Sequence, residues 1–110
     1  MTPKLVVLRA AARRDVDDAV NHYLTDAGRT TALRFIDHVE EAFFNVAMNP
    51  EPGSSRHGHE LNLPGLRSWP VRSFPYLVFY MTAGGQVDVW RVLHRQHDIP
   101  AWMDEGEGGE

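Results

Sequence analysis

Cysteine is absent from the 110-residue chain. Disulfide bonds, thiolate metal sites and a cysteine nucleophile are therefore excluded, and the absence fits a reducing cytoplasm. Long apolar runs are also missing, because no stretch approaches the roughly 18 apolar residues that a membrane helix needs. The opening MTPKLVVLRAAARRD has too short an apolar run for a signal peptide. We therefore expect a soluble, cytoplasmic protein.

Lysine is nearly absent, since Lys4 stands beside ten arginines. The net charge is −4, but four of the acids fall in the last seven residues, DEGEGGE. This segment, 104–110, is predicted to be a disordered acidic tail. Residues 1–103 are then electrically balanced and long enough for one domain with a single core. Within 63–97, four arginines stand against one acid, Asp88, which predicts a local basic patch.

Hydrophobic periodicity predicts two helices near the N-terminus, after a short β-branched strand at 5–9. Apolar side chains recur every three or four residues over 16–27 and again over 32–46. Gly28 is expected to end the first helix, and Pro50 to end the second. Because the connection is short, the two helices should form an antiparallel hairpin.

Three further strands are predicted at 66–72, 75–82 and 86–94, the last two joined by the turn AGGQ. A proline- and glycine-rich surface loop at 49–65 separates them from the helices. The resulting order, β-α-α-β-β-β, predicts a two-layer α+β domain. In it the helix hairpin packs on one face of a small, twisted and mainly antiparallel sheet.

Arginine and histidine positions on the strands are the candidate binding residues. Guanidinium groups can hold phosphate or a partner's carboxylates through paired hydrogen bonds, although each can instead be solvated or paired with the chain's own acids. A bulge at Pro70 would bring two of the arginines to one side of the sheet. The candidates are Arg67, Arg72, Arg91, His94, Arg95 and His97.

The end of the last strand, HRQH, also suits RNA cleavage. One imidazole would take a proton from a 2′-hydroxyl and the other would protonate the leaving oxygen, while Arg95 stabilised the charged intermediate. The competing interpretation is that His97 and Asp98 only end the strand. His57 and His59 are expected to be loop residues without a metal. No Walker, Rossmann or GxSxG pattern occurs, so neither a metal nor another cofactor is expected.

The second predicted helix carries apolar residues outside its main stripe. Leu33 and Phe44 are eleven residues apart and so fall on nearly the same bearing, with Met48 close behind. They can form a docking groove for a partner's helix. Exposed apolar residues are also common without any function, and both interpretations stay open.

The segments NPEPG, GLRSWPVRSFPYLVFY and VDVWRVLHRQHDIP, in this order of elements, resemble the ParE/RelE toxin superfamily. The resemblance extends from about Leu5 to Trp102, and FPYLVFY and VLH…DIP resemble the ParE branch. It implies the toxin of a type II toxin–antitoxin module, which inhibits DNA gyrase by binding and has no catalytic site of its own. A ParD-like antitoxin, with a ribbon-helix-helix part that binds operator DNA, would neutralise it.

The resemblance also implies roles for the candidate residues. The six strand residues would contact the target, and the antitoxin would contact Leu33, Phe44 and Met48. ParE-like sequences commonly carry an arginine before the aspartate of this motif. Here His97 takes that place, so either Arg95 substitutes for it or the toxin is weakened.

Two alternative functions stay open at this point. The RelE branch implies a ribosome-dependent mRNA endoribonuclease that uses the same arginines. The balanced charge and single lysine argue against it, because binding ribosomal RNA needs several phosphate contacts. The other alternative is a relative that binds an antitoxin but is no longer toxic.

Overall fold

The computed structural model describes residues 2–108, with side chains up to Met103. The predicted order of strand, two helices and three strands is confirmed, and two further helices are added. The elements are β1 (Val6–Leu8), α1 (Ala10–Asp26), α2 (Arg29–Met48), α3 (Arg56–Glu60), β2 (Arg67–Pro70), β3 (Tyr76–Ala83), β4 (Gln86–His94) and α4 (Ile99–Gly108). Within the described residues, none of the helices is long and apolar enough to cross a bilayer.

The four strands form one sheet in the order β1-β4-β3-β2. β1 runs parallel to β4, whereas the other two pairs are antiparallel, as the mainly antiparallel prediction required. The turn between β3 and β4 places Gly84 and Gly85 at φ values of 59° and 78°. A two-residue turn with both φ values positive matches the twist of the flanking strands, which explains the glycine pair.

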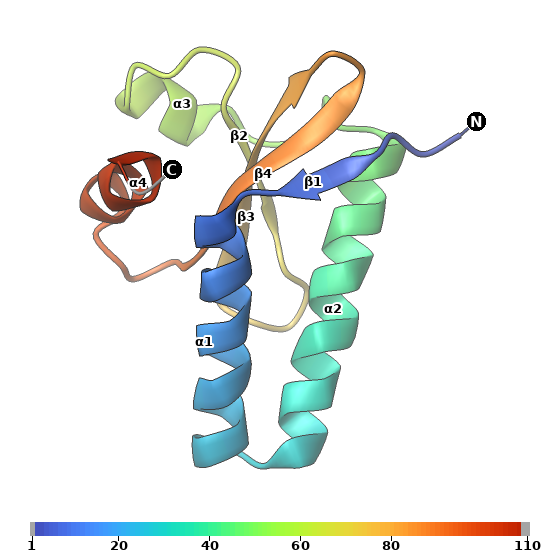
Figure 1. Cartoon of the computed structure of the whole chain (residues 1–110), viewed down its shortest axis with the longest axis vertical. Helices are drawn as coiled ribbons and strands as arrows, with labels where there is room; N and C mark the ends of the chain where they lie inside the picture. The colour runs from blue at the N-terminus through green and yellow to red at the C-terminus, as the bar shows by residue number, and fades with distance from the viewer. Residues whose placement is uncertain (1, 109–110) are drawn as a thin grey trace.

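The hairpin of α1 and α2 turns at Gly28, whose φ is 95°. The backbone N–H groups of Ala27 and Gly28 both donate to the Tyr23 carbonyl and so close the end of α1. Figure 1 shows the two helices side by side and antiparallel. α1 begins before the predicted apolar stripe, because the small residues Ala11 and Ala12 are buried there.

The hairpin packs on one face of the sheet around an aromatic cluster. The Tyr23, Phe35, Phe74 and Tyr76 rings meet at tilted or edge-on angles, with centroids 5.2–6.3 Å apart. Such geometry adds to the effect of burial. Burying each large apolar side chain stabilises the fold by about 1.5–3 kcal/mol. The hairpin and sheet therefore form a rigid support.

The other face of the sheet carries a smaller core. Phe79 of β3 and Leu93 of β4 pack with Ile99 and Met103 of α4. This explains why β3 is apolar on both faces. α4 spans Ile99–Gly108 and so includes part of the acidic segment 104–110, for which disorder was predicted. Residues 109 and 110 of that segment lie outside the described part of the chain.

The prediction of an uninterrupted loop at 49–65 is wrong, because α3 forms within it. Gly58 of α3 is buried, and a Cβ on it would lie 2.6 Å from the Leu66 carbonyl oxygen. The segment before α3 also pairs with β2 through a bridge between Ser54 and Ser68. These contacts hold α3 against the sheet.

Candidate binding groove

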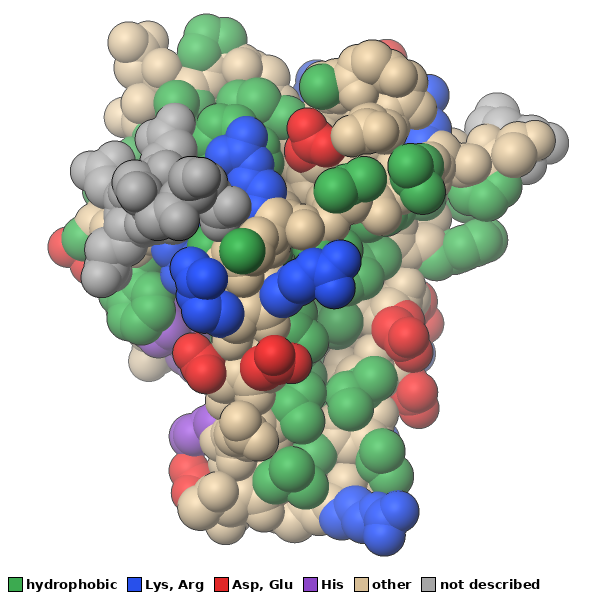
Figure 2. Space-filling view, viewed as in Figure 1, with side chains coloured by type: hydrophobic (Ala, Val, Ile, Leu, Met, Phe, Trp, Pro, Cys, Tyr) green, Lys and Arg blue, Asp and Glu red, His purple; other side chains and the backbone are tan. Residues whose placement is uncertain are grey.

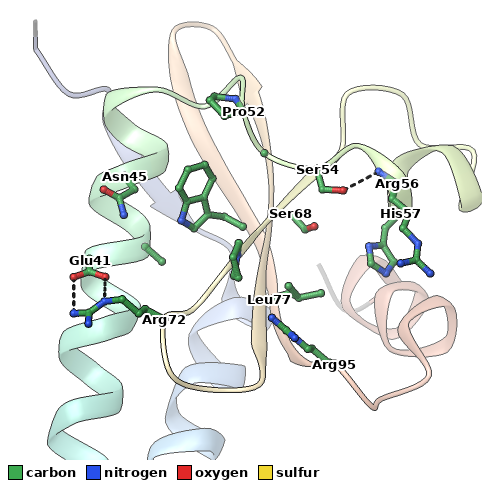
Figure 3. A pocket seen from close by; sticks show the side chains of 14 residues that line it. Glu41, Asn45, Pro52, Ser54, Arg56, His57, Ser68, Arg72, Leu77 and Arg95 are labelled. Carbon is green, nitrogen blue, oxygen red and sulfur yellow. Dashed lines mark hydrogen bonds and ion pairs between the residues drawn. The ribbon is translucent and has the colours of Figure 1, made fainter.

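A groove of about 870 Å³ lies between α2, β2 and the segment that leads into α3. We name it the α2–β2 groove. Its apolar lining comes from Ala42 on α2, Trp69 and Pro70 on β2, and Leu77 on β3. Arginines stand among the same lining residues, as Figure 3 shows. An apolar surface with guanidinium groups beside it suits a protein segment that carries both apolar and acidic side chains.

Arg72 and Arg95 are brought to this groove by strand ends. Because β2 and β4 are both antiparallel to β3, they run in the same direction, and their C-terminal ends lie at the same end of the sheet. Arg72 follows β2, and its carbonyl oxygen lies 2.7 Å from the His38 Nδ1 atom. Arg95 follows β4, and its backbone N–H donates to the Pro75 carbonyl. The backbone at both positions is therefore fixed.

Arg72 is paired with an acid of the chain, whereas Arg95 is unpaired among the described residues. Arg72 donates two hydrogen bonds to the Glu41 carboxylate, at 2.8 and 3.1 Å, and these bonds lower the pKa of Glu41. Both side chains are well exposed, at 63% and 41%, so the pair contributes little stability and can be exchanged. Arg95 is exposed, and its side chain has no hydrogen bond or ion pair with the residues that the structure describes.

Two groove residues were not predicted. Arg56 is exposed and paired with Glu60 at 3.2 Å. The His57 ring packs edge-on against Phe79, and its Nδ1 atom is buried without a hydrogen-bond partner among the described residues. Both lie on α3, whose five residues are too few for a periodic signal. At the end of the groove next to α3, Arg56 adds a positive charge and His57 adds a buried polar atom.

Arg67 lies apart from this groove. Its guanidinium donates to the Gly53 carbonyl at 2.9 Å, and it lines a separate hollow with Lys4 and Tyr80. The predicted bulge at Pro70 is wrong, because the irregularity of the sheet falls between Phe79 and Tyr80. Arg67 and Arg72 are therefore not brought together.

Arg91 is buried at 6% exposure, which corrects the expectation that it is free to contact a target. Its guanidinium donates to both Asp15 carboxylate oxygens, at 2.7 and 2.6 Å, and to the Trp102 carbonyl. The Val92 backbone N–H donates to the same carboxylate at 2.9 Å. β1 covers the edge of β4 only as far as Val89, so Asp15 completes the edge beyond it.

His94 and His97 line another groove, of about 540 Å³, on the α1 side of β4. His97 stacks on Trp102 with ring centroids 4.3 Å apart. Burial, followed by the neighbouring His97 and His22, lowers the pKa of His94. Arg95 lines the α2–β2 groove instead. The Arg95 side chain, which was expected to assist RNA cleavage, therefore lines a different groove from the two imidazoles.

The predicted antitoxin contacts lie on α2 but outside the α2–β2 groove. Leu33 and Phe44 are 50% and 58% exposed, and Met48 is partly buried. α2 reaches the groove through Glu41, Ala42 and Asn45 instead. The helix thus presents a groove-lining face and a separate apolar surface.

Together, the helix hairpin, the four-stranded sheet and the charged groove define a small α+β protein with a built surface site. A family model described as "ParE toxin of type II toxin-antitoxin system, parDE" matches residues 6–99. The chain belongs to this ParE toxin family.

A solved structure described as "Chromosomal ParDE TA system from P. aeruginosa" contains a similar chain. The TM-score is 0.70 at 19% identity, and the match covers 83% of this chain and 95% of that one. At this identity the likeness shows a shared fold. A comparison with curated proteins found no match.

Proposed function

We propose that this ParE-family protein inhibits DNA gyrase by binding it, and that a ParD-like antitoxin with a ribbon-helix-helix part neutralises it. The observation that carries the proposal is the family match over residues 6–99, which supports a toxin role. The α2–β2 groove supports a mechanism by binding, because it offers an apolar lining and guanidinium groups that can bind carboxylates.

Within this proposal, Arg95 and Arg72 are the foremost target contacts. Arg95 is exposed beside the groove, and Arg72 can exchange its surface pairing with Glu41 for a carboxylate of the target. His94 and His97 remain candidate contacts from their separate groove. The structural bonds of Arg67 and Arg91 give these two residues a role in holding the fold.

The apolar surface of α2 is proposed as the antitoxin contact, through Leu33, Phe44 and Met48. Burying large apolar side chains that are about half exposed would favour association. This surface and the groove share α2, so an antitoxin bound here would lie close to the proposed target contact.

The endoribonuclease alternative has weaker geometric support. Arg95 and the two imidazoles line different grooves, and Arg91 is bound to Asp15.

The alternative of a non-toxic relative is tested by expressing the protein without an antitoxin. Normal growth with intact DNA replication would favour that alternative.

Two assays of the purified protein separate the mechanisms. We expect inhibition of DNA supercoiling by gyrase, and intact messenger RNA when the protein is added to a translation extract. Cleaved messenger RNA with unaffected supercoiling would establish the endoribonuclease instead.

The double variant Leu33→Ser/Phe44→Ser should still inhibit gyrase but resist neutralisation by the antitoxin.

A further inference from the structure

Three arginines lie close together where β1 runs into α1. Arg9 follows β1, and Arg13 and Arg14 belong to the first turns of α1. The Arg13 backbone N–H donates to the Arg9 carbonyl, so these two residues stand one helical turn apart. Figure 2 shows Lys and Arg side chains gathered on this face of the molecule. We name Arg9, Arg13 and Arg14 the N-terminal arginine surface.

The three arginines of the N-terminal arginine surface form no ion pair within the described residues. Arg13 and Arg14 are exposed. Of the nearest acids, Asp15 is buried and bound to Arg91, whereas Asp17 and Asp18 are exposed one helical turn further along α1. The surface therefore differs from Arg72 and Arg91, whose charges are compensated within the chain.

The helix dipole does not explain the position of these arginines. Positive charge at the start of a helix opposes the helix dipole, and the first turn of α1 contains no acid. A ligand with negative charge would relieve this repulsion.

Arg9 is held in place by an aromatic ring. Its guanidinium carbon lies 4.0 Å from the centre of the Trp90 ring. Trp90 falls at the irregularity of the sheet, where Arg91 and Val89 pair with consecutive residues of β3. Stacking occupies one face of the guanidinium and leaves its N–H edge able to bind an anion. The side chain therefore loses less freedom when it binds.

We propose that the N-terminal arginine surface binds the phosphate backbone of duplex DNA. Arg9 and Arg13 are separated by about 6 Å along the helix axis, which is close to the axial distance of about 6.8 Å between one phosphate and the second one along the same strand, at about 3.4 Å per step. These arginines line neither the α2–β2 groove nor the groove that contains His94 and His97. An open surface suits an extended polyanion, whereas a small phosphate compound needs a concave site.

The inference rests on the proposed function, because gyrase presents DNA to a toxin bound beside it. The net charge of −4 opposes binding to free DNA, so the contact is weak alone and acts when gyrase raises the local concentration. It carries no base-sequence preference, since only phosphates are contacted. Three phosphate contacts give a slope of about −2.7 for log affinity against log salt concentration.

Fluorescence anisotropy with a short labelled duplex tests the proposal. The variant Arg13→Gln/Arg14→Gln is compared with Arg29→Gln/Arg34→Gln, which changes the net charge equally at exposed positions of α2. We expect the first variant to lower the salt slope by about 1.8 and to bind about tenfold more weakly at low salt. The second should bind as the wild type does, and circular dichroism should show both variants folded.

Two outcomes of this titration overturn the proposal: no DNA binding by the wild type, or an equal loss of DNA affinity in both variants. A third comes from measuring binding to gyrase without DNA, if the first variant loses affinity for gyrase alone and keeps its affinity for DNA. The last would identify an acidic protein surface as the ligand instead. Supercoiling assays keep the two proposals apart. If the wild type inhibits gyrase while the first variant binds DNA normally, only this inference fails. If the wild type leaves gyrase active, the proposed function fails, whichever DNA affinity is measured.

Discussion

Single residues in this protein divide into those that hold the fold and those that are free to bind. Arg91 and Arg95 are four residues apart, yet one is buried against Asp15 and the other is exposed. Their sequence surroundings do not distinguish them, because the partner of Arg91 lies 76 residues away in the chain. The number of arginines on the strands therefore overstated the binding surface. Arg95 and Arg72 are exposed at strand ends, and their contact with a target stays a prediction.

The Asp15–Arg91 pair should be a large single contribution to stability. Replacing Asp15 by Ala leaves a buried guanidinium and the Val92 N–H without their carboxylate. We expect the free energy of unfolding to fall by about 3–5 kcal/mol, measured by urea denaturation. Asp17→Ala, at an exposed position of the same helix, should change it by less than about 0.5 kcal/mol. Equal values for the two variants would show that the pair is not a structural bond.

Arg91→Ala should be destabilising for the same reason. A loss of toxicity in this variant would then reflect unfolding, which removes Arg91 as a probe of target contact. Arg95→Ala should retain the stability of the wild type, because its side chain is exposed and unpaired among the described residues. A change in toxicity of Arg95→Ala would therefore report on target contact and not on unfolding.

His94 should make stability depend on pH. Its pKa is lowered in the folded protein, chiefly by burial, so the unfolded chain binds the proton more readily. The free energy of unfolding should decrease as the pH falls from about 7.5 through 6.5 to 5.5. The contribution of Glu41, whose pKa is also lowered, is lost only below about 4.5 and falls outside this window. His94→Gln should show a smaller decrease, and an identical decrease would contradict the assignment.

Elements were predictable to the extent that their signals are local. The stripes of α1 and α2, the Gly28 stop and the β3–β4 turn all depend on neighbours in sequence, and all were found. α3 was missed because its five residues lie in a proline- and glycine-rich segment. The separation of Arg67 from Arg72 was missed because the sheet irregularity lies between Phe79 and Tyr80, opposite Trp90, and not at Pro70. The groove is lined in part by Arg56 and His57 of α3, so it could not be predicted as a whole.

The seating of α3 depends on Gly58. A Cβ at this position would lie 2.6 Å from the Leu66 carbonyl and 3.0 Å from the Leu63 carbonyl, both of which are backbone atoms. We expect Gly58→Ala to lower the free energy of unfolding by about 1–3 kcal/mol. His59→Ala, at the exposed neighbouring position, should be within about 0.5 kcal/mol of the wild type. Thermal melts of the two variants provide the comparison, and an unchanged Gly58→Ala would show that α3 moves freely.

At the scale of the whole molecule, the fold separates three surfaces. The hairpin and sheet support the α2–β2 groove at one edge, an apolar surface on the outside of α2, and the N-terminal arginine surface where β1 meets α1. The family relationship identifies the protein as ParE-like. The arrangement of the surfaces explains how a chain with a net charge of −4 can still present positive charge to a target.

Gyrase supercoiling measured with wild type, Arg95→Ala and Arg29→Ala tests the central claim most directly. The wild type should inhibit supercoiling, and Arg95→Ala should need about ten times more protein for the same effect, as expected when a charged hydrogen bond to a partner is lost. Arg29→Ala removes an equal charge from an exposed position at the start of α2 and should inhibit as the wild type does. Full gyrase activity in the presence of folded wild-type protein would contradict the account.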